Sequence, residues 1–275
     1  MRYFGLPDEY SSFDKSRFVL LPVPYEGTVS YGTGTSRGPE AILQASQEVE
    51  LYDDETDSEP FLKGICTLEP MDCADNPKAN ADNVYEKVRE LMEKDKFVLT
   101  IGGEHSITSG EVKAFLEKYP DLTVLQVDAH ADLREEFDGE RYSHASVMSR
   151  VKELGANIVQ VGVRSMSYEE KDIEVVRFSA RELKGDWIDK VISSLGEHVF
   201  LTFDLDGLDP SIMPATGTPE PGGLTWQQAT TLLKELCKKR KVLGADFVEL
   251  APIAGMHASD FLAARLIYKF IGYLG

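Results

Sequence analysis

Short apolar segments alternate along the chain with longer segments of helical period, and this alternation constrains the fold more than any other feature. Parallel strands need long crossover connections, usually helices, so this order predicts an α/β fold with a mostly parallel sheet. Right-handed crossovers then place helices on both faces, which makes a three-layer α/β/α domain. The predicted strands are residues 17–23, 97–101, 122–127, 157–163, 199–203 and 242–248, with a further candidate at 173–178.

Helical period and boundary residues predict the elements between these strands. Pro39 suits the first turn of a helix, and Ser106 and Thr225 suit the N-cap positions of two others. Residues 53–59 are predicted to be a solvated acidic loop, and residues 61–79 to be irregular or short strand. The predicted helices are residues 39–52, 80–95, 107–118, 143–154, 186–196, 226–238 and 258–272.

The 275 residues, of which 42% are hydrophobic, suffice for one large α/β domain or two small ones. No linker or internal repeat divides the chain, so we expect one domain over residues 1–275. We also expect a cytoplasmic location, because the chain shows neither a signal peptide nor a segment long enough to cross a membrane. Cys66, Cys73 and Cys237 lack a Cys-x-x-Cys spacing, which favours reduced thiols over disulfides or a zinc ribbon.

The formal net charge is −18, from 47 acidic and 29 basic residues. Such a surface repels nucleic acid and anionic lipid, so neither is expected as a partner. The negative charge favours cationic substrates and metal ions, but it is a weak argument because many acidic proteins are simply soluble.

The segment Asp128-Ala-His-Ala-Asp132 directly follows the apolar run at residues 122–127. In a nearly extended chain every second side chain points the same way, so Asp128, His130 and Asp132 aim at one point. Carboxylates so close repel each other, and burying them costs several kcal/mol per ion unless a cation compensates. A divalent metal ion is the simplest compensation, and the alternative is a solvated acidic loop with an isolated histidine.

More polar clusters begin where other predicted strands end. His105 follows a Gly-Gly turn, and Glu249 ends the last strand. Asp204 and Asp206 repeat the spacing of two. Because parallel α/β sheets build their sites beyond the carboxyl ends of the strands, we expect these clusters to meet. The candidate metal ligands are His105, Asp128, His130, Asp132, Asp204 and Asp206.

Six ligands, four of them carboxylates, are too many for one zinc ion. Hard oxygen ligands mixed with two imidazoles suit a pair of Mn²⁺ ions, with Co²⁺, Ni²⁺, Fe²⁺ or Zn²⁺ as alternatives. Two ions about 3.5–4 Å apart can share a water molecule and lower its pKa from about 15.7 toward 7. The ligand set therefore predicts two Mn²⁺ per chain and a hydrolytic site.

Four motifs follow one another along the chain: Gly102-Gly-Glu-His-Ser106, Asp128-Ala-His-Ala-Asp132, Ser143-His-Ala-Ser146 and Asp204-Leu-Asp-Gly-Leu-Asp-Pro210. Together they resemble the motifs of the ureohydrolases, the arginase and agmatinase family. Gly27–Ile42 and Val248-Glu-Leu-Ala-Pro252 are also similar, so the resemblance covers nearly the whole chain. It implies an arginase-like fold, hydrolysis of a guanidino group to urea and an amine, and a homo-oligomer, as a trimer or hexamer.

The resemblance also implies which residue binds which ion. Asp128 and Asp204 match the carboxylates that bridge the two manganese ions. The remaining ligands match in pairs, one pair for each ion: His105 with Asp132, and His130 with Asp206.

Further positions match residues that act on the substrate. Asp132 also occupies the position that helps to move a proton, and His144 matches a histidine associated with proton shuttling at the pocket mouth. Glu249 matches the carboxylate that holds the guanidinium. Glu104 and Ala145 depart from the family, in which Asp and Gly are usual, and Ala145 can alter the pocket wall.

The resemblance leaves several substrates open. The family's arginases carry a polar loop beside the proton-shuttle histidine, whereas the segment Tyr142-Ser-His-Ala-Ser-Val-Met148 is short of amides and apolar after the histidine. A substrate without the carboxylate of an amino-acid head is therefore expected. Agmatine, converted to putrescine and urea, is the first expectation, and N1-aminopropylagmatine, converted to spermidine and urea, is the second. Guanidinobutyrate and formiminoglutamate follow, ahead of arginine, a deacetylase-type zinc amidohydrolase and a non-catalytic metal-binding protein. Tyr25 and Gly32–Gly34 are candidates to line the pocket.

Overall fold

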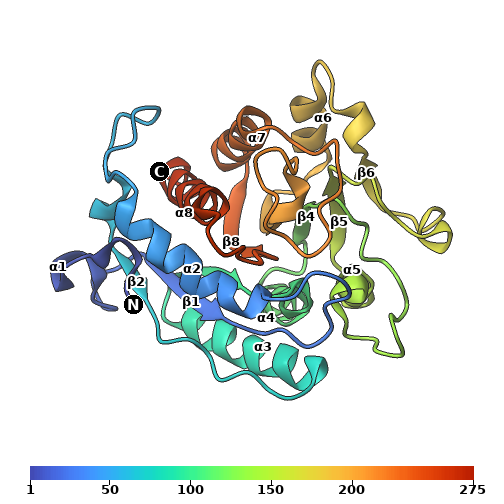
Figure 1. The fold of residues 1–275 in the computed structure, drawn as a ribbon, viewed down its shortest axis with the longest axis horizontal. Helices are drawn as coiled ribbons and strands as arrows, with labels where there is room; N and C mark the ends of the chain where they lie inside the picture. Colours follow the sequence, from blue (N-terminus) through green and yellow to red (C-terminus); the bar gives the residue numbers. More distant parts are fainter.

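Eight strands form one sheet in the computed structural model, which describes residues 1–275 (Figure 1). The strand order is β2-β1-β3-β8-β7-β4-β5-β6, and every neighbouring pair is parallel, which confirms the predicted fold class. The strands are β1 (Phe18–Val23), β2 (Ile65–Thr67), β3 (Phe97–Gly102), β4 (Thr123–Val127), β5 (Asn157–Val161), β6 (Val176–Phe178), β7 (His198–Asp204) and β8 (Lys241–Val248).

Helices cover both faces of this sheet (Figure 1). They are α1 (Asp8–Ser11), α2 (Gly38–Ala45), α3 (Pro77–Glu93), α4 (Thr108–Lys118), α5 (Val147–Glu153), α6 (Trp187–Ser194), α7 (Trp226–Lys239) and α8 (His257–Tyr273). One hydrophobic cluster packs α2, α6, α7 and α8 against the sheet, and a second packs α3, α4 and α5 against the opposite face. None of the helices combines the length and the apolar character that a membrane span needs.

Alternating side chains of the strands supply the two clusters. In β1, Phe18 and Leu20 belong to the first cluster, whereas Val19 and Leu21 belong to the second. This is the period of two of an extended chain. Strands that are buried on both faces need continuous apolar runs, which is why these segments stand out in the sequence.

The central strands of the sheet bring the candidate site residues together. β3, β8, β7 and β4 are neighbours in that order, and all are parallel, so their carboxyl ends lie at one edge. His105 follows β3, Asp128 follows β4, Asp204 ends β7 and Glu249 follows β8. The sheet therefore gathers side chains that are up to 144 residues apart in the sequence.

The helix predicted at residues 39–52 is shorter in the structure. α2 ends at Ala45, and a 3₁₀ turn follows at Ser46–Glu48. The Ser46 hydroxyl donates to the Leu43 carbonyl at 2.7 Å and accepts from the Phe4 amide at 2.9 Å. A serine that bonds the nearby backbone in this way competes with continued helix.

The prediction of a solvated loop at residues 53–59 was wrong for Asp53, which is fully buried. Its Oδ2 lies 3.0 Å from Lys269 Nζ and 3.2 Å from an Arg265 guanidinium nitrogen, and both partners are on α8. The Thr56 amide donates to the same carboxylate at 3.0 Å. Lys269, which compensates the buried charge of Asp53, lies 216 residues further along the chain, so the local sequence around Asp53 did not reveal it.

Of the two predicted helix caps, only Thr225 is confirmed. It begins α7 with a capping box, in which its hydroxyl accepts from the Gln228 amide at 3.3 Å and its own amide donates to Gln228 Oε1 at 2.9 Å. Ser106 makes no cap for α4, because its hydroxyl donates to Glu104 Oε1 at 2.6 Å.

Candidate functional site

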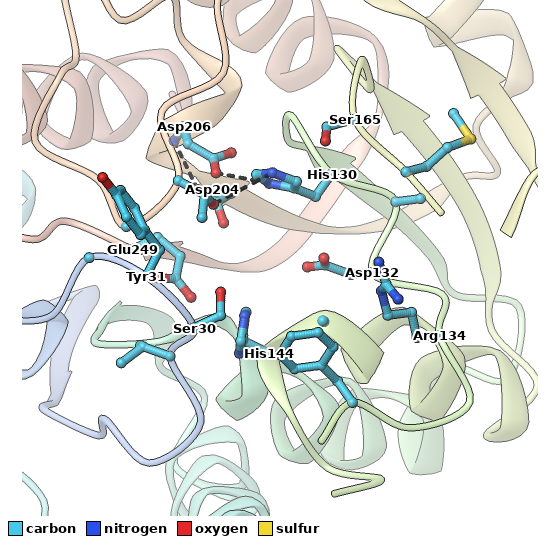
Figure 2. A pocket seen from close by; sticks show the side chains of 18 of the residues that line it. Ser30, Tyr31, His130, Asp132, Arg134, His144, Ser165, Asp204, Asp206 and Glu249 are labelled. Carbon is cyan, nitrogen blue, oxygen red and sulfur yellow. Dashed lines mark hydrogen bonds and ion pairs between the residues drawn. The ribbon is translucent and has the colours of Figure 1, made fainter. Parts of the chain in front are cut away.

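A cavity of about 280 Å³ opens at the carboxyl ends of the central strands (Figure 2). Its walls come from the segment after β4, the end of β7, the residue after β8 and the loop between β1 and α2. Figure 2 shows His144 across the cavity from Asp206 and His130, with Asp132 and Glu249 at its sides. The predicted site residues that line it are His130, Asp132, His144, Asp204, Asp206 and Glu249.

One group of candidate ligands surrounds the buried imidazole of His105. Its Nδ1 lies 3.2 Å from Asp128 Oδ2, 3.2 Å from Asp132 Oδ2 and 3.3 Å from Asp204 Oδ2. These side chains are almost inaccessible to solvent. The structure thus brings together four residues that reach the site from three different strand ends.

The second group surrounds His130. Its Nδ1 lies 3.0 Å from Asp206 Oδ2 and 3.6 Å from Asp128 Oδ1. Asp128 therefore directs Oδ2 toward His105 and Oδ1 toward His130. A carboxylate shared by two groups of ligands has the arrangement that a pair of neighbouring cations requires.

The carboxylates in this cluster crowd one another. Burial raises the pKa of Asp132 to about 7, and the charge of Asp128 contributes to this shift. Burial and the charges of Asp206 and Asp128 likewise raise the pKa of Asp204 well above its usual value. His105 Nδ1 is buried and has no hydrogen-bond partner, although it faces these oxygens. Divalent cations would satisfy the unpartnered nitrogen and neutralise the crowded carboxylates, so the residues present fit a metal centre.

The ring of His105 is oriented from behind by a buried hydroxyl. Its Nε2 lies 2.8 Å from Thr202 Oγ1, and this hydroxyl donates its hydrogen to Asp246 Oδ1 at 2.6 Å. Thr202 must then accept from an Nε2–H, which leaves the Nδ1 lone pair directed at the carboxylates. Such outer contacts fix the tautomer of a metal-binding histidine. Thr202 was not among the predicted site residues, and its position as a polar residue in the middle of the buried strand β7 was the available signal.

Buried amides hold Asp128 in a similar way. Gln126 Nε2 donates to Asp128 Oδ2 at 2.6 Å, and Gln160 Nε2 donates to Gln126 Oε1 at 2.6 Å. Arg177 Nε donates to Gln160 Oε1 at 2.7 Å and ends the chain of bonds. These residues were not among the predicted site residues either, although glutamines inside apolar strands, here fully buried, need partners of this kind.

Asp132 and Glu249 are held in left-handed backbone conformations, with φ of 54° and 69°. Such conformations cost about 1–3 kcal/mol for residues other than glycine and persist only where surrounding contacts hold them. The Asp132 carbonyl accepts from the Met148 amide at 2.9 Å, and the Glu249 amide donates to the Gly103 carbonyl at 2.8 Å. Both carboxylates reach the cavity wall from these turns.

Glu249 and His144 face the same cavity from outside the two ligand groups. Glu249 Oε1 accepts from the His105 amide at 2.6 Å, and burial, followed by the charge of Glu104, raises the pKa of Glu249 well above its usual value. Thr28 Oγ1 lies 3.1 Å from His144 Nδ1.

The remaining candidates divide between the cavity and the interior. Ala145 lines the cavity, and so does Gly32, whereas the other two residues of the predicted Gly32–Gly34 segment do not. Tyr25 does not, because its side chain is buried in the second hydrophobic cluster. Glu104 is buried and accepts from the Gly27 and Thr28 amides at 2.6 and 2.7 Å, so it anchors the loop that forms one wall.

The profile of the Arginase family matches residues 16–272. The chain belongs to this family. It is 40% identical to N(1)-aminopropylagmatine ureohydrolase of Synechocystis sp. over 96% of the chain and 91% of that protein. It is also 33% identical to agmatinase of Bacillus cereus, over 89% of the chain and 87% of that protein.

Solved structures agree with this assignment. The agmatine ureohydrolase of Thermoplasma volcanium superposes with a TM-score of 0.91 at 31% identity, covering 100% of the chain and 94% of that structure. Arginase from Bacillus subtilis superposes with a TM-score of 0.79 at 25% identity, covering 94% and 99%. The arginase-family chain is therefore a hydrolase with an arginase-like fold, as the motifs predicted.

Proposed function

We propose that the cavity binds two divalent cations and hydrolyses a guanidino group to urea and an amine. The observation that carries this proposal is the Asp128 carboxylate, which is shared by two ligand groups. Glu249 and His144 line the same cavity as His130 and Asp206 (Figure 2). In the proposed arrangement one cation is held by His105 and Asp132 and the other by His130 and Asp206. Asp128 and Asp204 would hold both cations, and the position of Asp128 between the two histidines supports this role for Asp128. Mn²⁺ is the proposed ion because hard oxygen ligands predominate.

When bound, the two cations supply a water molecule of lowered pKa and stabilise the negative charge that develops during hydrolysis. Glu249 orients the substrate: Oε1 is held by the His105 amide, and Oε2 remains to accept from a guanidinium N–H in a charge-assisted hydrogen bond. Asp132 lies 3.2 Å from His105 Nδ1 and lines the cavity, so it can pass a proton to the leaving nitrogen.

The substrate is proposed to be a linear guanidino amine, with agmatine and N1-aminopropylagmatine as the two candidates. The names of relatives add weight to the second, because four N(1)-aminopropylagmatine ureohydrolases are 34–40% identical to the chain, whereas three agmatinases are 32–33% identical. Urea release from equal concentrations of both compounds, guanidinobutyrate, formiminoglutamate and arginine tests the choice. Release of urea from none of them would contradict the proposed reaction.

Replacement of Glu249 with glutamine is expected to lower kcat/KM for the preferred guanidine by about 10²–10³-fold, because the variant loses the charge that pairs with the buried guanidinium. Steady-state urea release by the metal-loaded protein measures the effect. Glu169→Gln is the matched control, since Glu169 is an exposed carboxylate and should leave kcat/KM unchanged. Equal losses in both variants would argue against a role for Glu249 in substrate binding.

We also make proposals about the domain organisation, the oligomeric state and the location of the protein. We propose one domain over residues 1–275, supported by the single sheet that runs from β2 to β6. We propose a trimer or hexamer, which light scattering would detect as three or six times the mass of 30.6 kDa. We also propose a cytoplasmic location.

A further inference from the structure

The histidine at the cavity mouth is held by a threonine that lies 116 residues away in the sequence. Thr28 Oγ1 accepts from the His144 amide at 3.0 Å and lies 3.1 Å from His144 Nδ1. The ring is thus fixed on its Nδ1 side, while the residue itself lines the cavity across from Asp206 and His130 (Figure 2).

The hydrogen of the Thr28 hydroxyl is already used elsewhere. It is donated to Glu104 Oε1 at 2.8 Å. The same carboxylate also accepts from the Gly27 amide at 2.6 Å, the Thr28 amide at 2.7 Å and the Ser106 hydroxyl at 2.6 Å. Because Glu104 accepts from every one of these groups, Thr28 offers His144 only lone pairs.

We propose that Thr28, oriented by Glu104, is a positioning residue that holds His144 as the Nδ1–H tautomer and leaves the Nε2 lone pair for the cavity. An oxygen that can only accept requires a donor opposite it, and the neutral ring can donate from Nδ1 only if Nε2 carries no hydrogen. This inference rests on the proposed function for its consequence in catalysis, but the tautomer itself follows from the contacts of Thr28.

The surroundings favour a neutral ring. Burial lowers the pKa of His144, with Glu104 opposing this shift and His105 and His130 adding to it. A neutral ring with a free Nε2 lone pair can accept a hydrogen bond from the N–H of a guanidinium or ammonium group. The other tautomer would direct an N–H at the same cationic groups and repel them. The position of the hydrogen on His144 therefore matters for a cationic substrate.

Thr28→Val preserves the shape of the side chain and removes the hydroxyl, so the tautomer of His144 is no longer fixed. We expect kcat to fall by about 10–100-fold, the usual size of such outer contacts, while KM changes by less than about threefold. Thr28→Ser retains the hydroxyl and should restore most of kcat. A purely structural role of the threonine methyl would predict the opposite, namely an active Thr28→Val, which keeps a methyl, and an impaired Thr28→Ser, which lacks it.

Glu104→Gln provides the sharper test, because it should reverse the tautomer. The glutamine oxygen can still accept from the Gly27 and Thr28 amides, but its NH₂ group would face the Thr28 and Ser106 hydroxyls. Thr28 would then accept from the glutamine and donate its own hydrogen to His144 Nδ1, which moves the ring hydrogen to Nε2. Metal content is measured in parallel, since Glu104 precedes His105.

The tautomer is read directly by ¹H–¹⁵N correlation spectra of the ¹⁵N-histidine-labelled, zinc-loaded protein, since zinc is diamagnetic. The chain has only five histidines, and the His144→Asn spectrum identifies the signals of His144. We expect the ring hydrogen of His144 on Nδ1 in the wild type and on Nε2 in Glu104→Gln. In Thr28→Val we expect a mixture of the two neutral tautomers. Hydrogen on Nε2 in the wild type, or an unchanged tautomer and kcat in both variants, would overturn the proposal. This readout needs no turnover, so a failure of the proposed reaction is distinguished from a failure of the proposed tautomer.

Discussion

Asp128→Asn is expected to abolish tight binding of the metal pair and to lower urea release by at least about 10³-fold, because one oxygen of Asp128 faces each ligand group. Burial opposes ionisation of Asp128, but the hydrogen bonds and charges of His105 and His130 outweigh it and lower the pKa of this carboxyl. Asp128 also accepts from the Gln126 side chain and the His130 amide, so the metal-free variant is expected to be less stable than the metal-free wild type. Circular dichroism at the assay temperature shows whether the variant is folded and thereby separates loss of metal binding from unfolding.

Two measurements check this prediction. Elemental analysis after dialysis should give two metal ions per chain for the wild type and fewer for the variant. Added Mn²⁺ should raise the melting temperature of the wild type and leave that of the variant nearly unchanged, because only a bound ligand stabilises the folded state. Asp121→Asn is the matched control, since Asp121 is exposed and precedes β4 whereas Asp128 follows it. Hydrolysis by metal-depleted Asp128→Asn would refute the metal-dependent mechanism.

Asp53→Ala is expected to lower the free energy of unfolding by about 3–5 kcal/mol, because it leaves the buried ammonium of Lys269 without its main partner. The side chain of Lys269 is 8% exposed and would keep only Glu55, at 3.0 Å. Asp54→Ala is the matched control, because the Asp54 side chain is 84% exposed and should change the stability by less than about 0.5 kcal/mol. Chemical unfolding at neutral pH measures both variants.

The pH dependence of this effect has a definite sign. Burial opposes ionisation of Asp53, but bonds from Lys269 and Thr56 outweigh it and lower the pKa of this carboxyl below its usual value. Its contribution to stability is therefore fully present above the unfolded pKa of about 3.9 and is lost as the pH falls through the folded value. The wild type and Asp53→Ala should converge in stability at more acidic pH. Recovery of stability in the double variant Asp53→Ala/Lys269→Met would show that the unpaired ammonium causes the loss.

Much of the fold could be predicted because its main elements leave local patterns. Strands such as β4 and β7 are buried on both faces and therefore appear as continuous apolar runs. The Thr225 cap was predicted correctly because its partner, Gln228, lies three residues away. The predicted cap at Ser106 and the predicted length of α2 were wrong, because Ser106 and Ser46 form hydrogen bonds with groups outside the helical pattern.

The ligand candidates were recognisable for a related reason. His105, Asp128 and Asp204 stand at strand ends, and the topology of a parallel sheet sends all such positions to one edge. The spacing of two within each segment adds the other ligands. Sequence order and residue type were sufficient to propose these side chains, since both the strand ends and the alternation are local properties.

The roles of supporting residues depended on contacts between distant segments. Thr202 reaches His105 across 97 residues, and Thr28 reaches His144 across 116. A hydroxyl has one hydrogen to donate, so its effect on a histidine depends on where that hydrogen goes. In both cases it goes to a carboxylate, and this can be known only when all three groups are placed in space.

The alternation of apolar and polar segments in this chain predicted the sheet, the edge at which the cavity lies and the side chains proposed to hold metal. It could not establish the orientation of those side chains, the burial of Asp53 or the hydrogen positions on His105 and His144. The physical reason is that the periodicity of a sequence indicates only which face of its own helix or strand a residue occupies. Burial of charge and the direction of a hydrogen bond depend on partners that only the folded chain brings within about 3 Å.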